Sequence, residues 1–295
     1  MSRRLLAIHA HPDDESSKGA GTYARYVGDG ARVMVVSCTG GERGDIQNPA
    51  LEASAMADRD MGGLRRIEME HARGILGVEH RWLGYHDSGL PEEGETVPAL
   101  AFALIPLEIS AEPLVRIIRE FRPQVVHTYD ETGGYPHPDH IRTHEIAMFA
   151  IEAAADADRY PEAGEAWTVS KVYFDRIFSS ARVKAMHARL LELEPESERT
   201  TALAEMIEWM GERGAGATTR IDVGDWLDER DAALRAHASQ VAGDSAFFFW
   251  PNELQREIWP WEDFQRERSL VESPLPETDL FAGLAGDAAD AGAGS

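Results

Sequence analysis

An apolar run that ends in a dense cluster of imidazoles and carboxylates constrains this chain most strongly. Leu5-Leu6-Ala7-Ile8 is followed directly by His9-Ala10-His11-Pro12-Asp13-Asp14-Glu15. The apolar run favours a β-strand, and the charged cluster cannot be buried without partners because an unpaired charge is costly in a protein core. We therefore expect the cluster at the carboxyl end of a strand, where open α/β sheets have their ligand sites.

A second cluster has the same organisation. The apolar run Val125-Val126-His127-Thr128-Tyr129 precedes Gly133-Gly134-Tyr135-Pro136-His137-Pro138-Asp139-His140. The two strand-to-loop junctions converge if both strands are parallel and central in one sheet. Imidazole and carboxylate are common zinc ligands, and His11 and Asp14 face the same way on a helical turn. The sequence therefore predicts a metal site with ligands from both clusters, which leaves Asp13 free to act as a base.

The rest of the chain predicts an α/β fold, a Rossmann-like, mostly parallel sheet flanked by helices, in a single domain over residues 1–281. Strands are expected at 5–8, 32–38, 81–83, 124–129, 171–177 and 218–223, and helices at 18–27, 65–76, 112–121, 140–155 and 226–237. Residues 156–216 are expected to form an additional acidic lobe or insertion, and 247–264 an aromatic-rich segment that packs on the body. Residues 282–295 have almost nothing to bury and are expected to be disordered.

Composition narrows the classes of partner. The net charge of -23 argues against nucleic acid and against anionic membrane surfaces, because both repel an acidic protein. The single cysteine, Cys38, excludes an intramolecular disulfide and fits a reducing cytoplasm. No signal peptide or membrane span is recognisable. We therefore expect a cytoplasmic protein with a small-molecule substrate, whose oligomeric state the sequence does not indicate.

Both clusters carry the resemblance of this chain to a known family. His11-Pro12-Asp13-Asp14-Glu15 and His137-Pro138-Asp139-His140 resemble the two signatures of the PIG-L (LmbE-like) metal-dependent deacetylases. Within that family, further blocks resemble the mycothiol S-conjugate amidases, and the likeness covers roughly residues 3 to 270. These blocks are Ser16 to Ala20, Thr39 to Gly44, Trp82 to Leu90, Tyr129 to Tyr135 and Ala236 to Gln240.

The resemblance implies a ligand set and a cofactor. His11, Asp14 and His140 match the metal positions of the family, with one Zn²⁺ per chain and a fourth position left open. Iron(II) is an alternative because the ligand set does not exclude it. His144 follows His140 by four residues and could be a further ligand, although the family pattern favours a place behind the ligands.

Four further residues match catalytic positions of the family. Asp13 matches the general base, and His137 a group that stabilises charge in the tetrahedral state. Asp139 matches a residue that orients His137, and Tyr135 one that donates a hydrogen bond to the oxyanion, with simple packing as the alternative for Tyr135. His237 lies in a shared block, and a place near the pocket is expected for it.

The resemblance further implies that three residues contact substrate, namely Lys18, Arg66 and Asp87. Lys18 stands out because the chain has 26 Arg and only three Lys. The alternatives are a solvated lysine in a first helical turn, surface charge for Arg66 and turn chemistry for Asp87. A charged pair on a pocket wall suits recognition of sugar and inositol hydroxyls.

The resemblance implies an amidase that cleaves the amide between the acylated cysteine and glucosamine in mycothiol S-conjugates, releasing a mercapturic acid and glucosaminyl-inositol in detoxification. The alternative within the family is the N-acetylglucosaminyl-inositol deacetylase of mycothiol biosynthesis. Lys18 and the loop Gly41-Glu42-Arg43 favour the amidase. An alternative of another class is a non-catalytic sugar- or nucleotide-binding α/β module. It predicts a glycine-rich phosphate loop after the first strand, where this chain has carboxylates that repel phosphate.

Overall fold

A single mixed sheet organises the protein. The computed structural model describes residues 2–52, 54–92, 94–177, 179–210, 216–248 and 250–284. Within these ranges, seven strands follow the order β3-β2-β1-β4-β5-β7-β6. They are β1 (Arg4–His9), β2 (Arg32–Thr39), β3 (Glu79–Tyr85), β4 (Val125–Thr128), β5 (Lys171–Asp175), β6 (Thr219–Asp222) and β7 (Trp261–Ser269). β1 to β5 are parallel, whereas β7 pairs antiparallel with β5 and β6. The predicted mostly parallel α/β sheet is confirmed.

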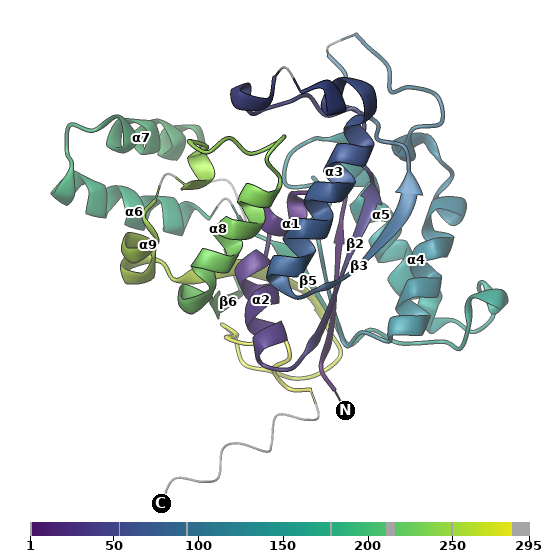
Figure 1. The fold of residues 1–295 in the computed structure, drawn as a ribbon. Coiled ribbons are helices and arrows are strands. Elements are labelled where there is room, and N and C mark those ends of the chain that lie inside the picture. Colours follow the sequence, from purple (N-terminus) through teal and green to yellow (C-terminus); the bar gives the residue numbers. More distant parts are fainter. Residues whose placement is uncertain are drawn as a thin grey trace, which may run out of the picture.

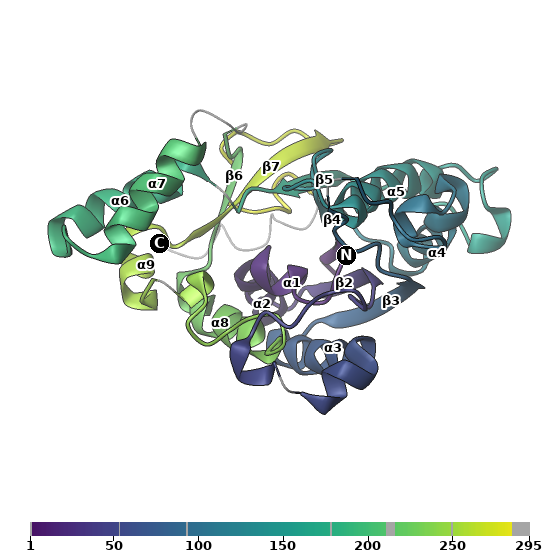
Figure 2. The same cartoon turned by 90° about the horizontal axis from the view of Figure 1, so that it is seen from above.

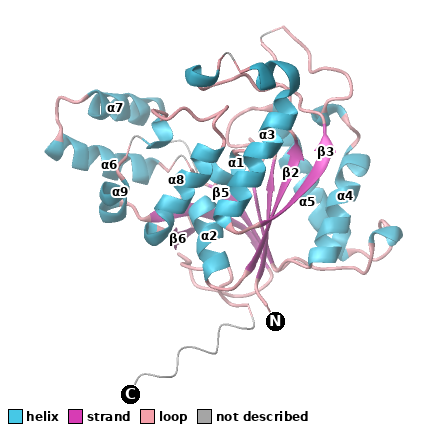
Figure 3. Ribbon diagram, viewed as in Figure 1, coloured by secondary structure: helices cyan, strands magenta, loops and turns pink. Residues whose placement is uncertain are grey.

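Helices cover both faces of the sheet (Figures 1 and 2). The helices described are α1 (Asp14–Ser17), α2 (Ala20–Gly28), α3 (Ala55–Leu76), α4 (Leu107–Phe121), α5 (Pro138–Ala155), α6 (Ser180–Leu193), α7 (Glu198–Met210), α8 (Leu227–Ala236) and α9 (Asn252–Ile258). α2, α3 and α8 lie on one face, and α4 and α5 on the other. Figure 3 shows the strands enclosed between these helices.

Side-chain alternation along the central strand gives each face its own apolar core. Leu6 and Ile8 of β1 pack in the cluster that includes α4 and α5. Leu5 and Ala7 pack in the cluster that includes α2, α3 and α8. Successive residues of a strand point to opposite faces, so a strand buried on both faces is apolar without interruption. This explains the continuous apolar run that starts the sequence.

Two elements differ from the sequence-based expectation. β7 is a strand between β5 and β6, where we expected only an aromatic-rich segment. Its sequence, WEDFQRERS, is mostly charged, and only Asp263 and Phe264 are buried. α3 begins at Ala55 instead of residue 65 and has a non-helical kink at Asp60.

The expected lobe at residues 156–216 contains two different kinds of structure. β5 belongs to the sheet, whereas α6 and α7 lie outside it beside α9 (Figure 2). These helices enclose a small apolar cluster of Val183, Met186, Leu190, Leu203 and Trp259. Of the expected tail, Ala282–Leu284 continue a turn in which Leu284 packs on the core, and 285–295 lie outside the described residues. Among the described helices, none combines the length and apolar character needed to cross a membrane.

Candidate metal centre and active site

The two sequence clusters meet where the strand order reverses. β1 lies between β2 and β4, and the chain passes from β1 to β2 on one side and returns through β4 on the other. Connections leave the carboxyl ends of β1 and β4 in opposite directions, and such a switch point is the usual ligand site of an open α/β sheet. α1 begins at Asp14 directly after β1, and α5 begins at Pro138 after β4.

Three buried residues from these junctions could hold a metal ion. His11, Asp14 and His140 each have one ligand atom within 4.8 Å of those of the other two. Oδ2 of Asp14 lies 3.5 Å from Nδ1 of His11 and 3.4 Å from Nε2 of His140. Nε2 of His140 is buried without a hydrogen-bond partner in the described part of the chain. Buried polar atoms normally have partners, so two imidazoles and a carboxylate converging here fit a divalent metal.

Hydrogen bonds at the outer nitrogens of the two imidazoles turn the other nitrogen of each ring toward the shared centre. Nδ1 of His140 lies 2.9 Å from the carbonyl oxygen of Gly133, and Nε2 of His11 lies 3.2 Å from the carboxylate of Asp139. Each outer nitrogen therefore carries the proton, which is the usual arrangement of metal-binding histidines. Burial lowers the pKa of His11, but the carboxylates of Asp139, Asp14 and Asp87 together raise it well above its ordinary value. These carboxylates therefore favour a positive charge at this imidazole, either as a proton or as a metal ion at Nδ1.

Asp14 is held by donors on both carboxylate oxygens. Oδ2 accepts from the hydroxyl of Tyr129 at 2.8 Å and from the backbone N–H of His11 at 3.0 Å, and Oδ1 accepts from the ammonium of Lys18. Although burial opposes ionisation, Lys18 and the two imidazoles hold the pKa of Asp14 well below its usual range. Lys18 itself is only 6% exposed, so it is a buried partner of Asp14 and not a solvated lysine.

Gly133 allows His140 to approach the ligand set. Its φ of +72° is a conformation that side chains disfavour. A Cβ atom at this position would lie 2.6 Å from Cβ of His140. The carbonyl that fixes the His140 imidazole therefore depends on a glycine at this position.

Asp13 is held beside the ligands in an unusual backbone conformation. Its φ of 110° and ψ of -28° are rare for a residue with a side chain and cost about 1–3 kcal/mol. Arg65 donates to Oδ2 of Asp13 at 3.1 Å and to the carbonyl oxygen of Pro12. Burial raises the pKa of Asp13, and the Arg65 guanidinium opposes that rise. Oδ1 has no hydrogen bond to any described residue, so one oxygen of this carboxylate is free to accept a proton.

The structure brings Arg65, and not Arg66, to this group. Arg66 is exposed, and its guanidinium lies 5.7 Å from the ring centroid of Trp82. Adjacent residues of a helix point about 100° apart. Arg65 is 3% exposed, and Gly41 makes room for it, since a Cβ there would lie 2.1 Å from Nη1. Sequence analysis missed Arg65, although it shares a helical face with the buried Met69 and Ala72.

His137 and Tyr135 lie beside the ligands. The ring of His137 packs edge-on to that of His11, with centroids 4.7 Å apart, and its Nδ1 accepts from the backbone N–H of Asp139 at 3.1 Å. Burial and the imidazoles of His11 and His140 lower the pKa of His137 to about 4. It is thus a neutral imidazole with its proton on Nε2. Tyr135 is 43% exposed, and its ring centroid lies 4.6 Å from that of His140.

Asp139 has a different partner from the one expected. Its carboxylate bonds to His11 and to Ser88, which donates its backbone N–H at 2.8 Å and its hydroxyl. The only hydrogen bond between Asp139 and His137 among the described contacts uses the backbone N–H of Asp139. Asp139 therefore orients His11, and Ser88 is a site residue that sequence analysis did not single out.

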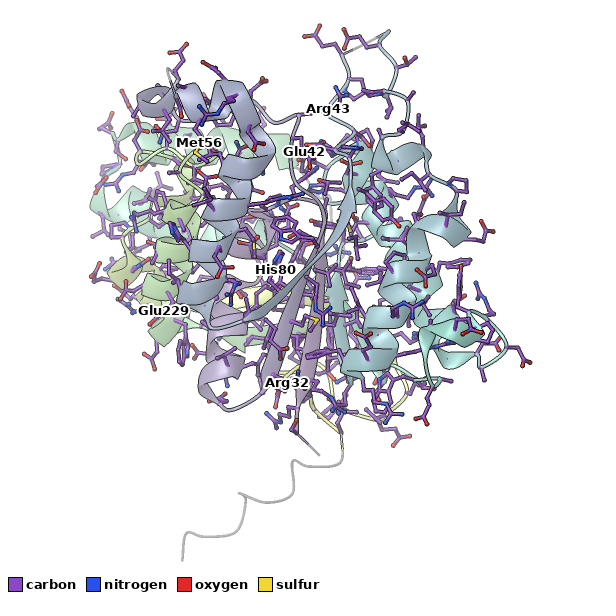
Figure 4. The ribbon with its side chains drawn as sticks, turned by 45° about the vertical axis from the view of Figure 1, so that its right-hand side comes forward. Arg32, Glu42, Arg43, Met56, His80 and Glu229 are labelled. Carbon is purple, nitrogen blue, oxygen red and sulfur yellow. The ribbon has the colours of Figure 1, made fainter. Side chains whose placement is uncertain are left out.

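Asp87 belongs to the rim of the site. Its carboxylate accepts from the backbone N–H groups of Gly89 at 2.7 Å and Arg43 at 3.2 Å, and lies 3.6 Å from Nε2 of His11. Its own N–H donates to Glu42. Figure 4 labels Glu42 and Arg43 side by side at this end of the sheet. The turn chemistry considered for Asp87 is thus present, at a position within reach of the ligand set.

His144 and His237, the two further histidines considered in the sequence, lie near the site but outside the ligand set. Nδ1 of His144 lies 3.0 Å from the carbonyl oxygen of Tyr129. Two sets of described residues have ligand atoms close enough to hold a metal, and His144 is in neither of them: they are His11, Asp14 and His140, and His11, His137 and Asp139. His237 is fully buried, with Nε2 2.7 Å from the carboxylate of Glu15. His144 therefore lies behind the ligands, and His237 lies on the Asp13 side of the site.

Comparisons with known proteins agree with this architecture. Residues 6–151 match the family described as PIG-L, GlcNAc-PI de-N-acetylase. The mycothiol S-conjugate amidase of Streptomyces coelicolor is 50% identical over 286 residues, which cover 95% of this chain and 97% of that protein. The 1D-myo-inositol 2-acetamido-2-deoxy-alpha-D-glucopyranoside deacetylase of Streptomyces avermitilis is 40% identical over 290 residues, which cover 96% and 98%.

A solved structure has the same fold. The N,N'-diacetylchitobiose deacetylase from Pyrococcus horikoshii matches with a TM-score of 0.61 and 19% identity, over 90% of this chain and 84% of that chain. The family match and the S. coelicolor relative define the class, metal-dependent hydrolases that act on amides, and the candidate His/Asp metal site at the switch point fits it. The chain belongs to the PIG-L family.

Proposed function

We propose that this protein is a zinc-dependent amidase that hydrolyses the cysteinyl-glucosamine amide of mycothiol S-conjugates to a mercapturic acid and glucosaminyl-inositol. The observation that carries the proposal is the 50% identity, along nearly the whole of both chains, to a relative named for this activity. The S. avermitilis deacetylase is less similar, at 40% identity. The ligand geometry supports the hydrolytic chemistry that both activities require.

In this proposal, His11 holds zinc through Nδ1, Asp14 through Oδ2 and His140 through Nε2. Zinc in such a site acts as a Lewis acid, polarising a carbonyl and lowering the pKa of water. Zinc is proposed because the chain resembles a zinc-dependent family, and two imidazoles and one carboxylate suit it. The same ligand set also suits iron(II), which stays the alternative. A cytoplasmic location is proposed as well, because the single Cys38 is a free, buried thiol.

The remaining residues act on protons and charge. Asp13 accepts the proton of the attacking water through its free Oδ1. The neutral His137 donates from Nε2 to the oxygen on which negative charge develops, and the exposed Tyr135 hydroxyl donates to the same oxygen. Asp139 and Ser88 take no part in proton transfer; they fix the orientation of the His11 imidazole.

Substrate recognition is proposed for Lys18 and Asp87. Both lie within contact distance of the ligand residues Asp14 and His11. Arg66 is proposed for the same role; it is exposed on α3, and its guanidinium lies 5.7 Å from the ring centroid of Trp82. Polar groups next to a metal suit a substrate rich in hydroxyls.

The alternative within the family is the deacetylase activity of the S. avermitilis relative. A rate comparison separates the two, using a mycothiol bimane conjugate and N-acetylglucosaminyl-inositol under the same conditions. The proposal expects kcat/KM to be higher for the conjugate by at least about tenfold, a difference of about 1.4 kcal/mol in transition-state binding. A higher value for the acetylated sugar would replace the amidase with the deacetylase.

A non-catalytic binding module is the alternative of another class. It predicts saturable sugar binding and no amide hydrolysis by the metal-loaded protein. Measurable turnover that Asp13→Ala abolishes, while metal is retained, would exclude it.

A further inference from the structure

Two side chains, Glu15 of α1 and Arg65 of α3, hold Asp13 in its left-handed backbone conformation. Its backbone N–H donates to Oε2 of Glu15 at 2.9 Å, and Arg65 of α3 donates to its Oδ2 and to the carbonyl oxygen of Pro12. A positive φ persists in a residue with a side chain only when its surroundings impose it. The network around Asp13 supplies that constraint.

Glu15 connects Asp13 to His237, which caps the carboxyl-terminal end of α8. Its Oε1 lies 2.7 Å from Nε2 of His237, and both side chains are fully buried. The hydroxyl of Ser16 donates to the same oxygen. Oε1 of Glu15 is thus fixed by His237 and Ser16, while Oε2 orients the backbone N–H of Asp13. Neither Glu15 nor His237 has a part in the chemistry described above.

The segment that carries His237 is fixed to the same helix that carries Arg65. Ser239 donates its backbone N–H and its hydroxyl to Glu68, each at 2.7 Å. Glu68 lies one turn along α3 from Arg65, and both are buried. α3 therefore presents one side chain to Asp13 and another to the segment that supports Glu15.

We propose that His237, acting through Glu15, is a positioning residue that fixes the backbone of Asp13 so that its free carboxylate oxygen faces the substrate amide. The proposal rests on the proposed function, because it takes Asp13 as the proton acceptor. A buried ion pair contributes less to stability than apolar packing of the same volume. A paired imidazole and carboxylate do supply direction, and an error of about 1 Å in a catalytic group costs about 100-fold in rate.

The test compares three variants of the metal-loaded full chain. His237→Leu removes the donor to Glu15, and His237→Gln keeps an amide N–H at a similar reach. Ser239→Ala is the matched control. It removes the buried 2.7 Å hydroxyl hydrogen bond to Glu68, whereas the backbone N–H of residue 239 still donates to Glu68 and keeps the segment that carries His237 in place. For each variant, kcat and KM on the conjugate, the bound zinc per chain and the urea midpoint of unfolding are measured.

The expected result is a selective loss in kcat. His237→Leu lowers kcat by about 10- to 100-fold with KM within twofold and zinc content unchanged, and His237→Gln recovers most of the loss. Ser239→Ala lowers the urea midpoint and keeps kcat within twofold. Equal kcat losses in His237→Leu and Ser239→Ala, or no rescue by glutamine, would overturn the proposal.

Glu15→Gln covers the case in which His237→Leu fails to fold. It is isosteric, and its single carbonyl oxygen cannot satisfy both the Asp13 N–H and His237, so kcat should fall while the fold is kept. A wild-type kcat in this variant would overturn the proposal.

Asp13→Asn distinguishes failure of the proposed function from failure of the positioning role of His237. If it retains full kcat, the proposed function of Asp13 fails. If it abolishes turnover while the His237 and Glu15 variants match Ser239→Ala, only this inference fails.

Discussion

The carboxylate of Asp139 accepts a hydrogen bond from Nε2 of His11 at 3.2 Å, joining residues 128 positions apart in the chain. Ser88, from the segment after β3, donates to the same carboxylate through its N–H and its hydroxyl. Three segments therefore fix one imidazole and its tautomer. The site is built as much by these supporting contacts as by the three candidate ligands.

Ser88→Ala tests this support. Loss of the hydroxyl leaves the buried Asp139 with fewer donors, so the His11 imidazole is held less firmly and the zinc dissociation constant should rise about 10-fold. The measurement is competition against a chromophoric chelator. Ser110→Ala is a suitable control, because its buried hydroxyl bonds to helix carbonyls of α4. Equal affinities in wild type and Ser88→Ala would contradict the supporting role.

Gly133 and Gly134 form a matched pair for testing the approach of His140. Both have positive φ, +72° and +74°, but an added Cβ would collide with His140 only at Gly133, and would meet open space at Gly134. Gly133→Ala should therefore be less stable to unfolding than Gly134→Ala by about 1–3 kcal/mol, and should bind less zinc. Urea unfolding and metal analysis measure both effects. Indistinguishable variants would show that the contact is not limiting.

Asp13→Asn separates metal binding from proton transfer. Asparagine keeps the size of the side chain and the contact with Arg65, but it cannot accept a proton at neutral pH. We expect zinc content to stay near that of wild type and kcat to fall by about 10²- to 10⁴-fold. A variant that loses its zinc would instead assign Asp13 to the ligand set.

The lowered pKa of the His80 imidazole predicts that the stability of the fold depends on pH. Burial lowers the pKa of His80, labelled in Figure 4, to about 4, and its Nε2 lies 3.0 Å from the hydroxyl of Ser37. Because the folded-state pKa is below the unfolded value of about 6.5, the unfolded chain takes up the proton first as the pH falls, and stability is lost between pH 6.5 and 4. His80→Gln lacks this titration.

The measurement is the free energy of unfolding in urea at pH 7 and pH 5 for both proteins. Wild type should lose about 1–2 kcal/mol more than His80→Gln over this interval, while other titrating groups contribute equally to both. Parallel losses in the two proteins would mean that the imidazole titrates normally in the folded state.

The sheet and the pairing of the two clusters could be predicted because both follow from local patterns. Apolar runs mark the buried parallel strands, and charged residues at their ends must lie outside the core. β7 could not be found in this way. It is a strand with few buried side chains, and its charges are satisfied by neighbours that are distant in sequence, such as Arg220 with Asp263.

The buried face of α3 shows a second limit. Ile67 and Ile75 are the kind of apolar residues that helical periodicity assigns to a core side, yet they are 46% and 39% exposed. The buried face instead carries Arg65 and Glu68 together with Met69. Charged residues become buried only when partners exist, and those partners, Asp13 and Ser239, come from other segments of the chain. Apolar periodicity alone therefore did not reveal that Arg65 is buried.

The most direct test of the account is the amount of zinc bound per chain after dialysis, in wild type and in His140→Leu. In the set His11, Asp14 and His140, His140 is the ligand that comes from the second cluster, and its buried Nε2 has no hydrogen-bond partner among the described residues. The account predicts about one zinc in wild type and close to none in the variant. Equal zinc contents in the two proteins would contradict a shared site for His11, Asp14 and His140.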